Sequence, residues 1–211
     1  DVSLAARVLK VANSPLYGFR RRMESVRDAV VMLGTRRVRS IASAMALAPM
    51  FREKPGSPIR GADLWAHSLA VALWTQRIAD RQHYVYTEHL FTAGLMHDIG
   101  IVVLAQAGGE LYETAVARCR DTEGDLVACE NEGVGTNHAW IGATLCAKWM
   151  LTPRLTQLIS HHHQDGCPAE PEAQILALAV LAQPEEVARA TLGVVEDLAL
   201  ALVPAHRVVI Q

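Results

Sequence analysis

The sequence is poor in aromatic residues, which make up 5% of its 211 positions, and its formal net charge is only −2. Much of its 51% hydrophobic content is alanine, and alanine-rich chains with few aromatic residues favour closely packed helices. The small net charge does not direct the chain as a whole to nucleic acid or to an anionic membrane. The length is sufficient for a substantial core in one large domain or two small ones.

Paired cysteine motifs and long apolar runs are also missing. None of the four cysteines forms a CxxC pair and no secretory signal is visible, so we expect reduced thiols in a cytoplasmic protein. No apolar run reaches the roughly 18–20 residues that are needed to span a bilayer. The chain begins at Asp1, without an initiator methionine and just ahead of a helical pattern, so we expect its start to be truncated.

The apolar residues recur with helical periodicity and predict an all-α, two-lobed protein. Residues 52–61 contain two prolines and two glycines, and we interpret them as a linker. This linker would separate an N-terminal helical subdomain, residues 1–51, from a larger helical subdomain, residues 62–211. Helix caps are expected at Ser25, Asp63, Thr136 and Thr152. No strand pattern is convincing, although the apolar end at 208–210 fits either a short strand or a frayed terminus.

The most informative pattern is the adjacent pair His97-Asp98, which has further histidines on both sides. His67 lies upstream, whereas His138 and the run 161–163 lie downstream. A neutral imidazole beside a carboxylate suits a divalent cation such as Zn²⁺, Mn²⁺ or Fe²⁺. An isolated pair is more often a helix-end histidine followed by a turn-forming aspartate. Here, however, the pair lies between an apolar helix end and Gly100, where a buried charge needs a partner.

Each flanking histidine also has an ordinary structural interpretation. His67 alone would more often be a hydrogen-bonded core histidine, and Asp63, four residues earlier, would either orient it or simply cap the helix, which we favour. His138 fits a first-turn surface residue as well as a ligand. Because successive helical residues point about 100° apart, His161, His162 and His163 cannot all face one pocket.

Several blocks of the sequence together resemble a known family. They include LAARVLKVANS at 4–14, WAHSLA at 65–70, AGLMHDIG at 93–100, and residues 138–149 followed by the histidine run. Residues 25–38 look like a further block. In this order and spacing they resemble the HD superfamily of metal-dependent phosphohydrolases, and more closely the HDOD domain, the HD-related output domain of bacterial signalling proteins. The resemblance covers nearly the whole chain.

The resemblance implies an all-helical bundle around an HD pocket and a regulatory module. Such modules are often joined to a receiver, sensor or output domain, and they are generally regarded as non-catalytic relatives of the hydrolases. The implied partner is a signalling protein or a fused receiver or sensor domain. If a metal such as Fe, Mn or Zn binds, we expect the ligands to be His67, His97 and Asp98, with His138 and His162 as further candidates.

The sequence departs from the hydrolase pattern at the last ligand. HD hydrolases complete their metal site with a late aspartate, but no aspartate occurs between Asp165 and Asp197, and the best match is Gln183. A neutral amide is a much poorer ligand than a carboxylate. In the cyclic-di-GMP phosphodiesterase branch a lysine follows the HD block and a Gly-Tyr-Pro motif comes later. Ile101 takes the place of that lysine, and residues 165–168 are at best a remnant of that motif.

We therefore predict a non-catalytic module that acts through protein–protein contacts. The alternative is a metal-dependent phosphohydrolase or phosphodiesterase acting on a nucleotide or a cyclic dinucleotide, because the histidine set is fuller than a decayed site needs.

An arginine cluster leaves a third possibility open. Its members are Arg20, Arg21, Arg22, Arg27, Arg36, Arg37 and Arg39. Such a cluster is able to contact the phosphates of a nucleic acid or nucleotide. Since only Tyr17 and Phe19 provide aromatic rings nearby, we favour a solvated helix face or an interface to a missing domain.

Overall fold

The computed structural model describes residues 2–14, 17–84, 87–163 and 171–181. All regular secondary structure within these ranges is helical, which confirms the all-α prediction. The described residues divide into two compact units, one within residues 1–49 and the other within residues 50–183. The exact subdomain limits proposed from the sequence stay a prediction. The short strand considered at 208–210 lies outside the described residues.

The first unit consists of α1 (Val2–Ala12), α2 (Val26–Leu33) and α3 (Thr35–Leu47), and each of these helices contacts the other two. Its buried apolar residues include Val8, Val11, Ala29, Leu33, Ile41 and Met45. Ser25 caps α2 as predicted, in a capping box with Asp28. The seven clustered arginines are all exposed in this unit, and their binding to phosphates stays a prediction.

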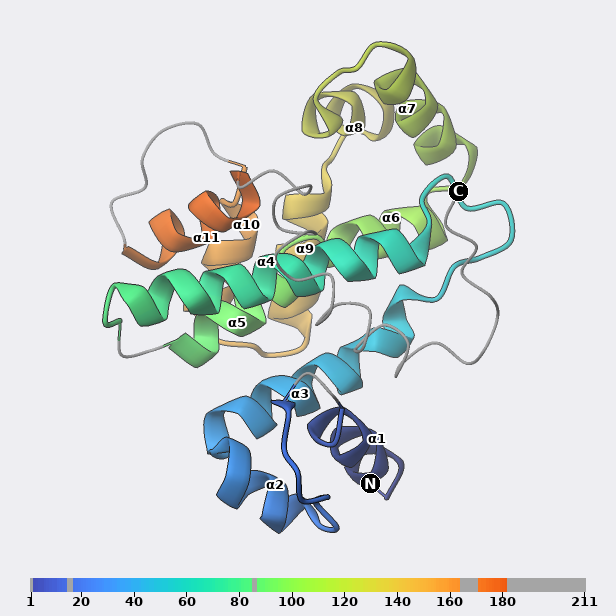
Figure 1. The fold of residues 1–211 in the computed structure, drawn as a ribbon. Coiled ribbons are helices and arrows are strands. Elements are labelled where there is room, and N and C mark those ends of the chain that lie inside the picture. Colours follow the sequence, from blue (N-terminus) through green and yellow to red (C-terminus); the bar gives the residue numbers. More distant parts are fainter. Residues whose placement is uncertain (1, 15–16, 85–86, 164–170, 182–211) are drawn as a thin grey trace. The chain divides into compact units, whose positions relative to one another are not determined.

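The second unit follows the short 3₁₀ turn η2 (Ala48–Phe51) and contains eight helices among the described residues. They are α4 (Gly61–Arg81), α5 (Thr87–Met96), α6 (Ile99–Ala107), α7 (Gly109–Asp121), α8 (Leu126–Val134), α9 (His138–Lys148), α10 (Pro153–Ser160) and α11 (Pro171–Leu181). The long helix α4 packs against α5 and α11, and α9 packs against both α6 and α10 (Figure 1). Helices α7 and α8 pair as a hairpin whose first helix contacts α6.

Two glycines bring the central helices of this unit unusually close together. A Cβ atom on Gly94 of α5 would lie 2.6 Å from Thr75 Oγ1 and 2.7 Å from the Cα atom of Ala72 in α4. A Cβ atom on Gly100 of α6 would collide with the carbonyl oxygen of His138 in α9. Gly100 lies in the first turn of α6, directly after the turn at residues 97–98.

Two of the predicted caps are wrong. Helix α4 begins at Gly61 with Arg60 at the cap position, so Asp63 lies within the first turn, where it pairs with Arg60 at 3.5 Å. Helix α9 is capped by Asn137 rather than Thr136, because the Asn137 carboxamide oxygen accepts the Trp140 N–H at 3.1 Å. The cap at Thr152 is confirmed, with Pro153 as the first residue of α10.

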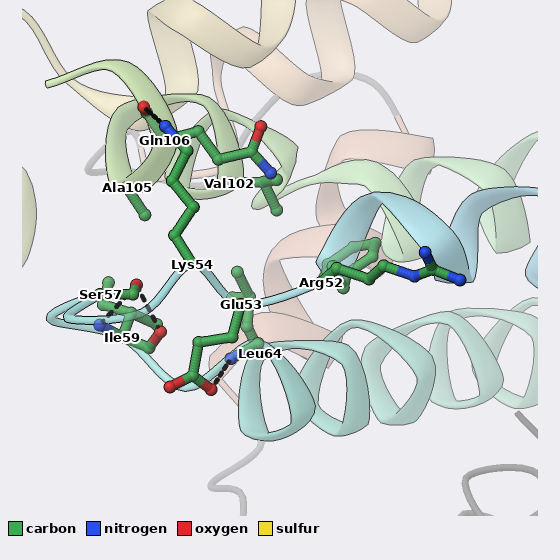
Figure 2. Close-up of a pocket in the computed structure, with 11 residues that line it drawn as sticks. Arg52, Glu53, Lys54, Ser57, Ile59, Leu64, Val102, Ala105 and Gln106 are labelled. Atoms are coloured by element: carbon green, nitrogen blue, oxygen red, sulfur yellow. Dashed lines mark hydrogen bonds between the residues drawn. The ribbon is translucent and has the colours of Figure 1, made fainter. Parts of the chain in front are cut away.

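The segment between η2 and α4 contacts helices of the second unit. The Lys54 ammonium donates to the carbonyl oxygen of Gln106 in α6, and Glu53 Oε2 accepts the Gly61 N–H at 3.2 Å. Figure 2 shows the small cavity that this segment forms with α4 and α6, with Leu64 and Val102 in its wall.

One stretch, His89–Ala107, has the length and mean hydropathy of a membrane span although His97 and Asp98 interrupt its apolar residues, and 72% of it is buried inside the protein. A buried stretch of this kind is ordinary for core helices.

Candidate metal centre

The site is centred on Asp98, which lies in the two-residue turn between α5 and α6. Asp98 is at the cap position of α6 but makes no side-chain cap hydrogen bond, and it is only 7% exposed. Its Oδ2 atom lies 3.1 Å from His97 Nε2 and 3.5 Å from His67 Nε2. Its Oδ1 atom lies 3.4 Å from the Nε2 atoms of both His138 and His162. All five residues that the sequence nominated therefore meet at one carboxylate.

The donor atoms form two groups that share Asp98. One group is His67, His97 and Asp98, and the other is Asp98, His138, His162 and His163. Within each group the donor atoms lie within 4.8 Å of one another, which is the spacing that a bound cation requires of its ligands. The two carboxylate oxygens of Asp98 face different groups.

The histidine run contributes two residues, His162 and His163, and the sequence had nominated only His162 by number. Helix α10 ends at Ser160, so residues 161–163 form a turn and the 100° spacing of a helix does not apply. His162 points to Asp98, and His163 Nε2 lies 2.9 Å from His138 Nε2. His161 is directed elsewhere, because its Nδ1 atom lies 2.9 Å from the Gln157 carbonyl oxygen. His163 was not nominated from the sequence, because a helical run does not indicate which two of the three histidines face the pocket.

Backbone carbonyl groups fix the orientation of two of the imidazoles. Nδ1 of His97 lies 2.7 Å from the Gly94 carbonyl oxygen, and Nδ1 of His162 lies 2.6 Å from the Ile159 carbonyl oxygen. A carbonyl oxygen only accepts, so each Nδ1 carries a proton, and in the uncharged ring each Nε2 then presents a lone pair to Asp98. His162 Nε2 is buried and has no hydrogen-bond partner among the described residues. A lone pair that faces a carboxylate is repulsive unless a cation lies between them, so these residues fit a metal ion.

Glu130 is a further residue of the site that the sequence analysis missed. It lies on α8, is fully buried, and its Oε2 atom accepts both the backbone N–H and the Nδ1–H of His138, at 2.8 and 2.6 Å. Its Oε1 atom accepts the Tyr112 hydroxyl at 3.2 Å. Glu130 is four residues from both Leu126 and Val134, which pack against one core cluster. An acidic residue within an apolar helical stripe requires buried partners, and that pattern was the available signal.

Burial and the mutual charges keep this cluster in the protonation state that a metal requires. Burial alone would raise the pKa of Asp98, but His97 and the other imidazoles hold that pKa well below its usual value. Burial lowers the pKa of His67, of His162 and of His163, the last to about 4. Near neutral pH the three imidazoles are therefore uncharged and the carboxylate is ionised, as metal ligation demands.

His138 differs from these three histidines. Burial would lower its pKa, but the hydrogen bond to Glu130 and the negative charge of Asp98 outweigh burial and raise it. A cation at Asp98 would oppose protonation of this imidazole, because a metal and a proton compete for Nε2.

The comparison with known families agrees with this geometry. The HDOD domain family matches residues 1–165 of the chain. The chain belongs to the HDOD family. As an HDOD domain, it is 31% identical to a crystallised HDOD protein of unknown function from Geobacter sulfurreducens, with a TM-score of 0.76 over 91% of this chain and 63% of that one.

Two further solved structures resemble this HDOD domain. A Shewanella amazonensis SB2B protein, named provisionally as a phosphohydrolase, is 25% identical with a TM-score of 0.75, over 96% of this chain and 84% of that one. The MmoQ response regulator from Methylococcus capsulatus str. Bath is 29% identical with a TM-score of 0.56, over 94% of this chain and 79% of that one. The chain spans about a third of the length of the curated relative that it matches.

The positions at which this HDOD domain departs from the hydrolases are only partly visible. Ile101 is buried in α6, where it offers no group to a phosphate. Gln183 and residues 165–168 lie outside the described residues, so the interpretation of both stays a prediction.

Proposed function

We propose that this HDOD domain is a non-catalytic regulatory module of bacterial signal transduction that binds a divalent cation at Asp98. It acts through contacts with a signalling protein or with a fused receiver or sensor domain, in the cytoplasm. Support comes from membership of the HDOD family, from the likeness to a response regulator and from the length of the curated relative, of which the chain spans a third.

The main support for metal binding is the orientation of the His97 and His162 rings, whose Nε2 atoms face Asp98. Nε2 of His97 and Nε2 of His162 face Asp98 while the Nδ1–H group of each donates to a backbone carbonyl oxygen. Imidazole and carboxylate ligands suit Fe, Mn or Zn. His67, His97 and Asp98 would hold the ion on one side, and His138, His162 and His163 offer donors on the other. A divalent ion would supply Lewis-acid polarisation of a bound oxygen.

The proposed absence of catalysis is supported by the small number of carboxylates at the site. Asp98 is the sole carboxylate in the donor groups found among the described residues. Glu130 does not replace a second one, because its two oxygens accept hydrogen bonds from His138 and Tyr112. The best match to the final aspartate of HD hydrolases is Gln183. Because an amide is neutral, it gives the metal site less negative charge than a carboxylate and binds the ion more weakly.

The second candidate is a metal-dependent phosphohydrolase or phosphodiesterase acting on a nucleotide or a cyclic dinucleotide. Two observations favour it: donors face both oxygens of Asp98, and one structural relative is named as a phosphohydrolase. His163, which is exposed, would then be a candidate acid or base beside a bound substrate.

Turnover measurements separate the two candidates. Protein purified without chelator is incubated with Mn²⁺, Fe²⁺ or Mg²⁺ and with bis(p-nitrophenyl) phosphate, nucleotides and cyclic dinucleotides, alongside His97→Ala. We expect wild-type and variant to show the same background hydrolysis. Hydrolysis by the wild-type protein that disappears in His97→Ala would overturn the non-catalytic proposal. His161→Ala is the matched control, since His161 is directed away from Asp98.

A further inference from the structure

Glu130 is a fully buried acidic residue in direct contact with the metal centre. It is fully buried on α8, yet it contacts one metal-site residue through two separate groups. Oε2 accepts the backbone N–H of His138, which is the first residue of α9 and so has no partner within its own helix. The same oxygen accepts the Nδ1–H of the His138 ring. Main chain and ring of His138 are therefore held by one carboxylate.

We infer that Glu130 is the positioning residue of the metal centre: it holds His138 with Nδ1 protonated and with Nε2 directed toward Asp98, where a cation would bind. The inference rests on the proposed metal site and adds a residue from a helix that supplies none of the ligands. His97 and His162 obtain the same orientation from backbone carbonyl groups. His138 alone among these three obtains it from a charged side chain, which also increases the basicity of the ring toward a metal.

The hydroxyl of Tyr112 on α7 completes the arrangement. It donates to Glu130 Oε1 at 3.2 Å, so the carboxylate has a fixed plane and both of its oxygens are occupied. Tyr112 is itself buried, at 1% exposure. The α7–α8 hairpin thus reaches the metal centre through this one carboxylate. A change in the position of the His138 ring would be transmitted to both helices of the hairpin.

Metal affinity provides the first test. Co²⁺ binding is measured by competition with a chelating indicator, together with the visible spectrum of the bound ion, for wild-type, Glu130→Gln and Glu132→Gln. Glu132 lies on the same helix but is exposed and pairs with Arg118, so its variant controls for the loss of one charge. We expect Glu130→Gln to bind Co²⁺ about 10–100-fold more weakly and with an altered spectrum, as for other outer partners of ligating histidines. Unchanged affinity and spectrum in Glu130→Gln, or equal weakening in Glu132→Gln, would overturn the inference.

The tautomer of His138 provides the second test, and it needs no metal. Long-range ¹H–¹⁵N correlation spectra of the chelator-treated protein report which ring nitrogen carries the proton. We expect Nδ1–H in wild-type and in Glu132→Gln, and loss of that state in Glu130→Met, which removes both acceptor oxygens. An Nε2–H tautomer in wild-type, or an Nδ1–H tautomer that persists in folded Glu130→Met, would contradict the role of Glu130. If wild-type binds no Co²⁺, the metal proposal fails while the spectra still decide the role of Glu130.

Discussion

Asp98 determines the electrostatics of the site because it faces four imidazole nitrogens at 3.1–3.5 Å. Its ionised form is favoured, since attraction to His97 and hydrogen bonds that the His162 and His97 rings donate when they carry a second proton lower its pKa well below the usual value, against the effect of burial. A buried carboxylate whose neighbours present lone pairs is stable only with a compensating positive charge. A bound divalent cation provides that charge without protonating the ring nitrogens.

Acid should destabilise the metal-free fold. Burial lowers the pKa of His67, of His162 and of His163, the last to about 4, so below their ordinary value of 6.5 the unfolded chain binds more protons at these sites than the native protein. The lowered pKa of Asp98 has the same effect at lower pH. The unfolding free energy therefore falls as the pH decreases.

His138 has the opposite effect on the unfolding free energy. Because its pKa is raised in the folded protein, it adds stability at low pH, and this stability is lost as the pH rises through the raised pKa. The pKa of His163, lowered to about 4, and the lowered pKa values of His67 and His162 all favour the unfolded chain as the pH falls from about 7 to about 5. Urea denaturation of chelator-treated protein should accordingly give a lower unfolding free energy at about pH 5 than at about pH 7. Equal or greater stability at the lower pH would contradict the assigned pKa directions.

Gly100 is the contact that sets the distance between α6 and α9, and both helices begin at the metal centre. A Cβ atom at this position would collide with the His138 carbonyl oxygen and lie 2.8 Å from the Gly142 nitrogen. Backbone atoms cannot move aside as a flexible side chain does. We expect Gly100→Ala to reduce the unfolding free energy by about 1–3 kcal/mol or more, as overpacking does, and to weaken metal binding by displacing His138.

Gly124→Ala is the control for this substitution. The nearest atoms to its added Cβ would be the Thr122 hydroxyl oxygen at 2.9 Å and Cys129 Sγ at 3.5 Å, and both belong to side chains. Urea denaturation of the two variants should therefore rank Gly100→Ala as clearly less stable. Equal stabilities would show that α6 and α9 separate without cost.

The sequence revealed the helices better than their ends. Thr152-Pro153 identified the start of α10 because a cap residue followed by proline is a local signal. At α9 two adjacent residues, Thr136 and Asn137, are both good caps, and only the backbone geometry shows that Asn137 is used. The run 161–163 follows the end of α10 as a turn, and helical periodicity could not show that His163 joins His162 at the site.

The ligand set could be nominated from the sequence because the family motifs carry it, but its partners could not. Glu130 precedes His138 by eight residues and lies on another helix, so no helical spacing relates the two. Their contact depends on how the α7–α8 hairpin packs near α9. Contacts between helices arise from tertiary packing, and a single sequence does not encode them in any short pattern.

Charge is distributed unevenly over the whole chain. Residues 1–49 carry nine basic and three acidic side chains, whereas residues 50–211 carry 11 basic and 19 acidic ones. The small net charge of −2 thus conceals a basic unit that includes the arginine cluster and an acidic remainder that includes the metal centre.

Metal binding should raise the stability of the whole second unit, because the ligands come from α4, from the turns after α5 and α10, and from α9. A ligand that binds only the native state stabilises it by about 2.7 kcal/mol at a free concentration 100-fold above its Kd. Thermal unfolding of chelator-treated protein should therefore shift to higher temperature on addition of Mn²⁺ or Zn²⁺. His97→Ala should show no such shift, and an equal shift in that variant would point to binding elsewhere.

The most direct test of the proposed function is the metal content of the untagged protein, purified without chelator and measured by mass spectrometry beside His97→Ala. His97 is the ligand candidate closest to Asp98. We predict about one or more equivalents of Fe, Mn or Zn in the wild-type protein and their loss in the variant. Metal-free wild-type protein, or the same content in His97→Ala, would mean that the cluster at Asp98 is a structural remnant and not a metal centre.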